Sequence, residues 1–182
     1  MEYLEDFYFL NSEVLLLASD RQRGKHFLKL LGAHPRVAHL ILTAGKNSIL
    51  TALRCREPLV TFAPELDELI NLSEAELRAT SPQQVPEELR RLTTTALHVA
   101  HRLAVADPLS AQTHFQFTPR QCERFMQIGI GRLTRLRDRR GVLLRLRAAE
   151  KVFTWERILI GDRLPDARGF RIAQRAAMAS LG

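Results

Sequence analysis

The sequence predicts a mainly α-helical protein built from two tandem units on one chain. Apolar residues recur at spacings of three and four along most of its length, which is the period of an amphipathic helix. Residues 50–60 and 133–143 share a pattern, 83 positions apart, of an apolar i, i+3 pair, charged residues, a Pro or Gly and a short apolar run. Leu15–Ala18 and Leu97–Ala100 agree at an offset of 82. A tandem duplication amounts to a dimer on one chain. We therefore expect a pseudodimer of residues 1–80, the first half, and 81–182, the second half; the alternative is chance similarity of amphipathic helices.

The elements of the first half follow from apolar spacing and from residues that begin or end helices. In order, we expect a helix over residues 3–22 that Gly24 interrupts, a helix over 25–31, a helix from Pro35 to Gly45, a helix capped by Asn47 or Ser48, a strand over 59–62 and a helical turn from Pro64. Ser73 and Glu76 have the spacing of a capping box, in which each side chain satisfies a free amide at a helix start.

The second half follows a connection over residues 80–86, where two prolines and polar neighbours are typical of a linker. Thr118, Pro119 and Gln121 form a strong helix-start signal. In order, we expect a long helix over 87–106, a break at Asp107, a helix from Thr118, a turn at Gly129–Gly131, a helix over 131–139, a strand over 142–146 and helices over 148–160 and 165–180.

Positive charge is concentrated in the last third of the chain. Residues 1–117 have 12 Lys and Arg against 14 Asp and Glu, a balance of −2, whereas residues 118–182 have 15 against 6, a balance of +9. Of the 27 basic residues, 23 are Arg, whose planar group suits phosphates and guanine edges. An Arg-rich coding bias explains the choice of Arg over Lys but not this asymmetry. The pattern indicates a surface for nucleic acid or an acidic partner.

A basic helix after the Gly129–Gly131 turn is the candidate DNA-binding element. Three arginines there have i, i+3, i+7 spacing and project from one face, and two more alternate with leucines on the predicted strand, which places them on its exposed face. The candidate DNA-binding residues are Arg132, Arg135, Arg139, Arg140, Arg145 and Arg147. The alternative is an ordinary solvated face. In residues 165–180, Arg168, Arg171 and Arg175 similarly share a face opposite Phe170, Ala173 and Ala177, and there we favour solubility as the explanation.

Nothing in the sequence predicts an enzyme, a cofactor or a metal site. There is no Gly-rich phosphate loop, nucleophile elbow or recognisable carboxylate pair. His98 and His101 lack a third ligand at suitable spacing, so a structural role is favoured. Cys55 and Cys122 form no CxxC motif, and occasional free thiols are typical of a reducing cytoplasm. The longest apolar run, Val14–Ala18, is too short to span a bilayer, and the acidic start is unlike a signal peptide.

The second half resembles FlhD, the flagellar transcriptional regulator, over roughly fifty residues. The resemblance rests on Leu97–Ala111, Ile128–Leu136 and Val142–Arg147. Its matching features are Ala100-x-Arg-Leu103, Val105-x-Asp107, Ser110-Ala111, Leu136 and a hydrophobic strand that ends in Arg147. The first half looks like a more diverged version, with matches at Leu15–Ala18, Gly32 and Leu59-Val60 and about two residues missing after Ala18.

This resemblance implies a mostly helical fold that dimerises by intertwining, in an activator that works with a larger, zinc-binding partner, FlhC. Family members have one unit and pair with a second chain, and Gln116 here occupies a position where the family pattern has Gly. We therefore expect a cytoplasmic transcriptional regulator subunit that binds double-stranded DNA, alone, by self-association or with an FlhC-like protein. The alternative is an adaptor or oligomeric scaffold that does not bind DNA, for example in a bacterial secretion system.

Overall fold

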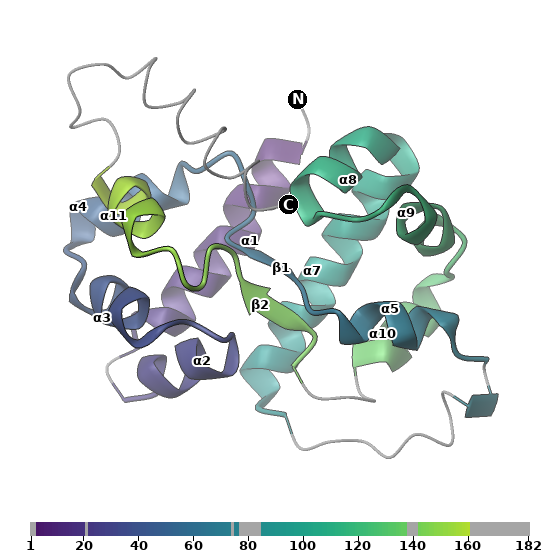
Figure 1. Ribbon diagram of the computed structural model, residues 1–182, viewed down its shortest axis with the longest axis horizontal. Coiled ribbons are helices and arrows are strands. Elements are labelled where there is room, and N and C mark those ends of the chain that lie inside the picture. The colour runs from purple at the N-terminus through teal and green to yellow at the C-terminus, as the bar shows by residue number, and fades with distance from the viewer. Residues whose placement is uncertain (1–2, 21, 74, 77–84, 138–141, 161–182) are drawn as a thin grey trace. The chain divides into compact units, whose positions relative to one another are not determined.

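The protein is mainly helical, as its sequence predicts. The structure, a computed structural model, describes residues 3–20, 22–73, 75–76, 85–137 and 142–160. Figure 1 shows the helices and the pair of short strands, β1 and β2, that these residues form. In the described part of the chain no helix is both long and apolar enough to cross a membrane.

The same order of elements occurs twice along the chain: a long helix, three shorter helices, a strand and a further helix. The first series is α1 (Tyr3–Ala18), α2 (Gly24–Leu30), α3 (Pro35–Thr43), α4 (Lys46–Leu53), β1 (Val60–Phe62) and α5 (Glu65–Asn71). The second series is α7 (Glu87–Ala106), α8 (Pro108–Phe115), α9 (Pro119–Met126), α10 (Ile130–Arg137), β2 (Leu144–Leu146) and α11 (Val152–Ile160).

The chain forms two compact units whose boundaries differ from those of the expected halves. Unit 1 comprises Met1–Val60 and Arg145–Gly182, and unit 2 comprises Thr61–Leu144. The chain therefore passes from one unit to the other within each strand, and the expected boundary at residues 80–81 falls inside unit 2. Each unit consequently combines four helices of one half with the final described helix of the other.

Unit 1 is built on α1, which packs against α2 and α4. The last described helix, α11, packs against α3 and α4, although the whole of unit 2 separates them in sequence (Figure 1). Trp155 of α11 is fully buried and is the largest side chain in this core. Full burial gives this tryptophan, which lies between Val152 and Leu159 in the sequence, a packing role.

Unit 2 is built on α7, which packs against α8, α9 and α10, while α5 packs against α9. Four phenylalanines form a cluster in its core, with ring centroids 5.1 Å apart for Phe117 and Phe125 and 5.5 Å apart for Phe62 and Phe115. Because β1 supplies Phe62 and α8 and α9 supply Phe115 and Phe125, this cluster joins residues of both halves.

The two strands pair antiparallel in a symmetric register. The Arg147 amide donates to the Leu59 carbonyl, and the Ala63 amide donates to the Leu143 carbonyl, each at 2.8 Å. These two bonds bracket Thr61 and Arg145. Leu59 and Leu143 are 84 positions apart, as are Ala63 and Arg147, so a shift by that offset converts one bond into the other.

Corresponding residues in the second part of each half are therefore 84 positions apart, and not 83 as the sequence pattern predicts. The first residues of α4 and α10, Lys46 and Ile130, differ by 84, and so do Pro35 and Pro119, which begin α3 and α9. The sequence pattern, at an offset of 83 positions, aligned the leucines of two amphipathic helices one residue out of register. Such errors arise because several registers of amphipathic helices superpose apolar residues.

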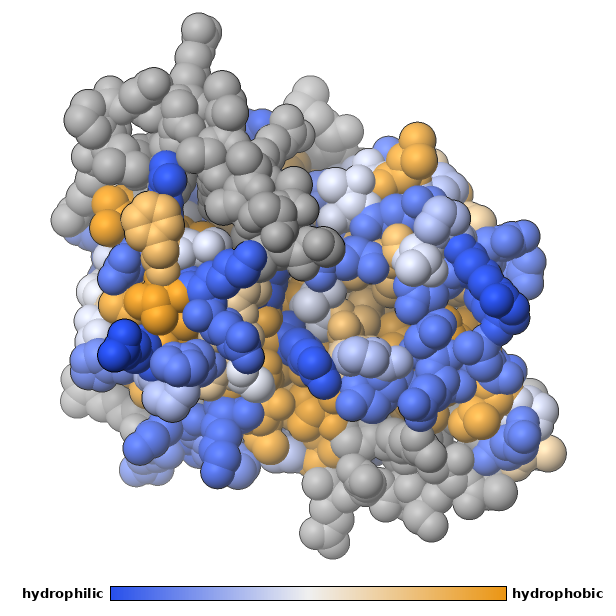
Figure 2. All heavy atoms as spheres, in the orientation of Figure 1, coloured by the Kyte–Doolittle hydropathy of each residue, from blue (hydrophilic) through white to orange (hydrophobic). Residues whose placement is uncertain are grey.

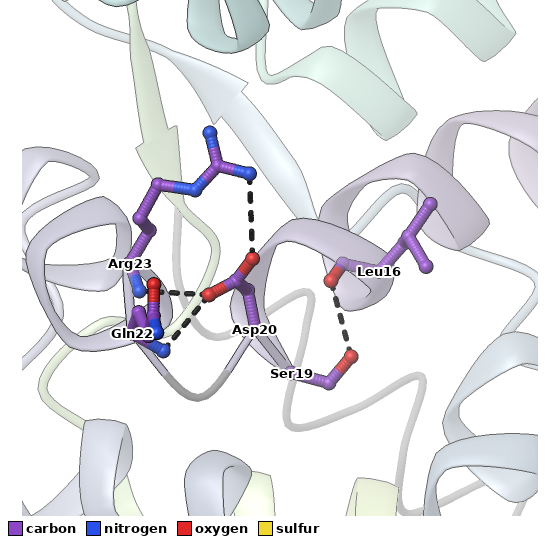
Figure 3. A network of polar contacts seen from close by, with 5 residues as sticks. All are labelled: Leu16, Ser19, Asp20, Gln22 and Arg23. Atoms are coloured by element: carbon purple, nitrogen blue, oxygen red, sulfur yellow. Dashed lines mark hydrogen bonds and ion pairs between the residues drawn. The ribbon is translucent and has the colours of Figure 1, made fainter.

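An aspartate precedes the second helix of each series: Asp107 is the N-cap of α8, whereas Asp20 lies in the turn before α2, whose N-cap is Arg23. The first helix ends at Ala18 rather than at residue 22, since Asp20 Oδ1 accepts hydrogen bonds from the Arg23 amide at 2.8 Å and the Gln22 amide at 2.9 Å (Figure 3). In the same network, the Ser19 hydroxyl donates to the Leu16 carbonyl at 3.1 Å. At the start of α8, Asp107 accepts from the Ser110 amide at 3.1 Å and the Ser110 hydroxyl at 2.6 Å.

The predicted capping box at Ser73 and Glu76 is confirmed, and the predicted helix start at Thr118 is a second capping box. Thr118 Oγ1 accepts from the Gln121 amide at 3.2 Å, while Gln121 Oε1 accepts from the Thr118 amide at 2.7 Å. Ser73 and Glu76 make the equivalent bonds at 3.2 and 2.7 Å. Gly24 begins α2 instead of interrupting α1. A Cβ there would lie 2.2 Å from the Ala18 carbonyl oxygen, so this close approach of the two helices requires glycine.

A left-handed residue ends α2 and α8 at equivalent positions. Gly32 has φ +75° and Gln116, 84 positions later, has φ +59°. Glycine adopts this conformation without a Cβ penalty, whereas glutamine is strained in it. The departure from the family pattern at Gln116 therefore changes the residue but keeps the backbone conformation of a glycine.

We expect Gln116→Gly to stabilise the protein by about 0.5–1 kcal/mol, because relief of left-handed strain exceeds the extra chain entropy of glycine. The matched change Gly32→Gln should destabilise it by about 1–2 kcal/mol, since a Cβ at Gly32 meets no neighbour and the cost is purely backbone strain. Urea denaturation measures both, and changes of the same sign would contradict the assignment of equivalent helix ends.

The stability of the protein should fall as Asp107 is protonated. Hydrogen bonds from the Ser110 side chain and amide hold the pKa of Asp107 below its ordinary value of 3.8, so its contribution is present above that pH and is lost as pH falls through the lower, folded-state pKa. Asp107→Asn keeps the cap but does not titrate. We expect its Tm to lie below that of the wild type at neutral pH and to converge with it in acid, whereas Glu150→Gln, in an exposed turn, should follow the wild type throughout.

Candidate nucleic-acid interface

Arg132 binds within unit 2 instead of projecting to solvent. Its guanidinium Nη2 donates to the Ile70 carbonyl at 3.3 Å and also to the Leu72 carbonyl, at the C-terminus of α5. A helix C-terminus has unsatisfied carbonyls and a partial negative charge, so a cation is favourable there. The prediction of an open arginine face is therefore wrong at Arg132, which holds α10 against the end of α5.

The other candidate arginines of this helix are only partly described. Arg135 is half-buried on α10, while Leu133 and Leu136 of the same helix are buried, as predicted. Arg139 and Arg140 lie outside the described residues. In the described part of α10, Arg132 and Arg135 are both half-buried, and Arg132 is engaged with the end of α5.

The two strand arginines separate into an exposed and a buried one. Arg145 is exposed between buried Leu144 and Leu146, as the alternation predicts, but Arg147 is only 3% exposed, which contradicts the prediction. The strand ends at Leu146 and the chain turns, with Ala148 at φ +53°. The period of two therefore stops before Arg147, whose side chain turns inward.

Arg147 is a buried charge with incomplete hydrogen bonding. Its Nε and Nη2 atoms have no hydrogen-bond partner among the described residues, and burial lowers the pKa of its guanidinium against the opposing attraction of Glu57. Its backbone carbonyl accepts from Trp155 Nε1 at 3.0 Å. Such a residue positions its neighbours and cannot meet a phosphate on the surface.

Asn11, which the sequence did not single out, holds the segment that leads into β1. It is fully buried, its Nδ2 donates to the carbonyls of Glu57 at 3.0 Å and Cys55 at 3.4 Å, and its Oδ1 accepts from the Leu59 amide at 2.7 Å. The available signal was an amide residue between Leu10 and Val14 on the apolar side of a helix. Burial raises the pKa of the neighbouring Cys55 thiol to about 11, so this cysteine is an inert core residue.

Several large apolar side chains are exposed, and Figure 2 shows orange patches among the blue hydrophilic surface. They occur on α1, around the α7–α8 connection, and on α4 and α11. These residues are Leu4, Tyr8, Phe9, Leu16, Leu50, Val105, Leu109, Phe153 and Ile160. Arg157 lies over the Phe153 ring, 5.4 Å from its centroid. Clustered exposed apolar residues are typical of surfaces that bind a partner.

The two histidines of α7 lie inside unit 2. The Nε2 atoms of His98 and His101 are buried and find no hydrogen-bond partner in the described part of the chain, and the His101 ring contacts Phe125 edge-on, with the ring centroids 6.1 Å apart. Among the described residues, no three His, Cys, Asp or Glu side chains gather as they would around a metal ion. The contact with Phe125 agrees with the structural role that we expect for His101.

We expect Asn11→Ala to destabilise the protein by about 2–4 kcal/mol, because it removes three hydrogen bonds and leaves the buried Leu59 amide without a partner. Asn47→Ala, on the exposed side of α4, should change stability by less than about 0.5 kcal/mol. Chemical denaturation measures both free energies, and equal effects of the two variants would contradict the role of Asn11.

Comparison of the chain with protein-family models, with curated proteins and with solved structures finds no match. The resemblance to FlhD therefore rests on the quoted residues, and the repeated order of elements stands beside it as an independent observation. Any assignment of function depends on these two features together with the exposed surface.

Proposed function

We propose that the protein is a transcriptional regulator subunit resembling FlhD, in which two FlhD-like halves form a pseudodimer on one chain. The reciprocal exchange of final helices carries this proposal: α11 of the second half packs against α3 and α4 of the first, and α5 of the first packs against α9 of the second. The resemblance implies dimerisation by intertwining, and fusing two intertwined chains would produce this exchange.

The symmetric strand pairing supports the same interpretation. In an isologous contact residue i meets residue j and residue j meets residue i. With Leu59 equivalent to Leu143 and Ala63 equivalent to Arg147, the two interstrand bonds form such a reciprocal pair. Two carbonyls that are 84 positions apart also accept hydrogen bonds from the strands. The Leu31 carbonyl accepts from the Leu146 amide, and the Phe115 carbonyl accepts from the Thr61 hydroxyl.

The described surface reduces the number of arginines that are candidates for DNA contact. We infer a role for exposed Arg145, with Arg135, Arg139 and Arg140 as further candidates, and none for Arg132 or Arg147, whose side chains serve the fold. The complete regulator would include an FlhC-like protein. Two free, buried cysteines support a cytoplasmic location.

An adaptor or scaffold that does not bind DNA is the second candidate. The internal use of Arg132 and the burial of Arg147 reduce the predicted basic surface, and the exposed apolar residues favour protein partners. A place in a bacterial secretion system fits this alternative. It predicts complexes whose stability depends on apolar area and changes little with salt.

Binding to a short random-sequence DNA duplex over a salt series distinguishes the two functions. We expect Arg145→Ala to weaken binding and to reduce the slope of log affinity against log salt by about one, since each phosphate contact contributes about that much. Arg36→Ala removes an exposed arginine of α3 outside the candidate set and should leave the slope unchanged. The measurement is repeated in the presence of an FlhC-like protein encoded nearby.

Absence of binding at low salt, with and without that protein, would contradict the DNA-binding function and favour the adaptor. Equal salt slopes for the Arg145→Ala and Arg36→Ala variants would contradict the role of Arg145 as a DNA contact. Arg132→Ala should lower Tm because α5 loses the cation at its C-terminus, and its DNA affinity should equal that of the wild type.

A further inference from the structure

One stretch of the first half is basic and contains no carboxylate. Residues 21–56 have no Asp or Glu and eight Lys and Arg: Arg21, Arg23, Lys25, Lys29, Arg36, Lys46, Arg54 and Arg56. The balance of −2 over residues 1–117 conceals this stretch, because carboxylates elsewhere in that part of the chain compensate for its charge. The equivalent residues 105–140, at the offset of 84, contain the carboxylates of Asp107, Glu123 and Asp138. A surface with charge of one sign attracts a partner of the opposite sign.

The outward face of α2 presents two of these charges to solvent. Lys25 and Lys29 are exposed, whereas Phe27 of the same helix is buried. Within the described part of the chain, neither lysine forms an ion pair with a carboxylate. Arg23, at the N-cap, differs because it pairs with Asp20 at 3.5 Å (Figure 3). We call Lys25 and Lys29 together the lysine face of α2.

Comparison with α8, the equivalent helix of the second half, shows that the fold does not require these lysines. At the offset of 84, Lys25 corresponds to Leu109 and Lys29 corresponds to Thr113. Both of these α8 residues are exposed, so the two positions face solvent in each half. The repeated unit therefore accepts an apolar and a neutral polar side chain where α2 has two cations.

Lys25 also occupies a position that is unfavourable for the helix itself. It lies in the first turn of α2, where free amides give a helix a partial positive charge. The residues of that turn are all described, and none of them is acidic. A residue that breaks a local rule without a structural gain is expected at a functional site. The charge of Lys25 therefore favours a role in binding over a role in folding.

The C-terminal end of α2 lies beside the exposed arginine of β2 (Figure 1). The Leu31 carbonyl, at the C-cap of α2, accepts from the Leu146 amide at 2.8 Å. Lys29 precedes Leu31 by two residues, and Arg145 immediately precedes Leu146, so both cations are close to this bond in sequence. All four residues belong to unit 1. The lysine face is therefore in the same unit as exposed Arg145, a candidate DNA contact.

We propose that the lysine face of α2 binds the phosphate backbone of duplex DNA beside Arg145, an inference that rests on the proposed DNA-binding function. Residues four apart in an α-helix, such as Lys25 and Lys29, lie about 6 Å apart along its axis. This distance is about two phosphate steps of one strand, at roughly 3.4 Å each along the duplex. Phosphate contacts position a protein on DNA without reading its sequence. The face thus supplies affinity and orientation, and does not select an operator.

Binding to the random-sequence duplex over a salt series tests this inference. We expect Lys25→Gln/Lys29→Gln to reduce the slope of log affinity against log salt by about two and to weaken binding at least about tenfold at about 0.1 M salt. The Tm should not fall, because loss of the Lys25 charge removes a repulsion at the helix start. Arg36→Ala is the control from the same unit. Arg36 corresponds to exposed Arg120, so an arginine there is common to both halves, and the slope should equal that of the wild type.

A relocated pair of lysines distinguishes this surface from an effect of net charge. Lys25→Gln/Lys29→Gln/Leu109→Lys/Thr113→Lys has the net charge of the wild type, but its two lysines are on α8. We expect its affinity and salt slope to equal those of the Lys25→Gln/Lys29→Gln variant, because α8 belongs to the other compact unit. Recovery of the wild-type slope would overturn the inference in favour of attraction by net charge alone.

The outcomes also separate this inference from the proposed function. A salt slope that Arg145→Ala reduces and Lys25→Gln/Lys29→Gln leaves unchanged would overturn the inference alone. Absence of DNA binding by the wild type would overturn both. If the double variant binds DNA as the wild type does but loses binding to a polyglutamate peptide, the lysine face serves an acidic protein and the inference is wrong.

Discussion

The pairing of β1 with β2 is the constraint on which the rest of the structure depends. Two backbone bonds, Arg147 to Leu59 and Ala63 to Leu143, join segments from opposite ends of the chain. An isolated two-stranded ribbon is marginal in water, so helices on both sides must stabilise it. Asn11 of α1 holds the segment before β1, and Trp155 of α11 holds the residue after β2. The strands and the packing of unit 1 therefore form together.

This arrangement makes each compact unit depend on both halves of the sequence. Unit 1 needs α11 to cover α3 and α4, and the phenylalanine cluster of unit 2 needs Phe62 from β1. The closing contacts join residues far apart in sequence, and such contacts cost loop entropy before they add stability. In the pseudodimer that we propose, the connection of the halves on one chain would lower this cost relative to assembly from two chains, because the second half is always present at high effective concentration.

Local signals in the sequence predicted the parts of the fold that local physics determines. The capping box at Ser73 and the helix start at Thr118 needed only neighbouring residues, and the structure confirms them. The end of α1 was predicted at residue 22 instead of 18, because the turn at Asp20 resembles an ordinary polar position within a helical pattern. The compact units could not be predicted, since an exchange of final helices leaves no periodic signal in the sequence.

The candidate site was less predictable than the fold, for a related reason. Spacing identified arginines that share a face, but the neighbour that a face meets is a tertiary property. Arg132 meets the carbonyl end of α5, which lies 60 or more residues away in sequence. Arg147 follows the last residue of a strand, where the alternation that would have placed it outside no longer applies.

The comparison of α1 with α7 explains how one fold can serve two surfaces. Both helices bury the same side, which the packing of each unit fixes. Their outward sides differ, because Tyr8 and Phe9 of α1 stand 82 positions before Arg90 and Arg91 of α7. In a symmetric dimer of identical chains every surface occurs twice. A fused pair of the kind that we propose could change one copy alone, and its outward surface could then be asymmetric.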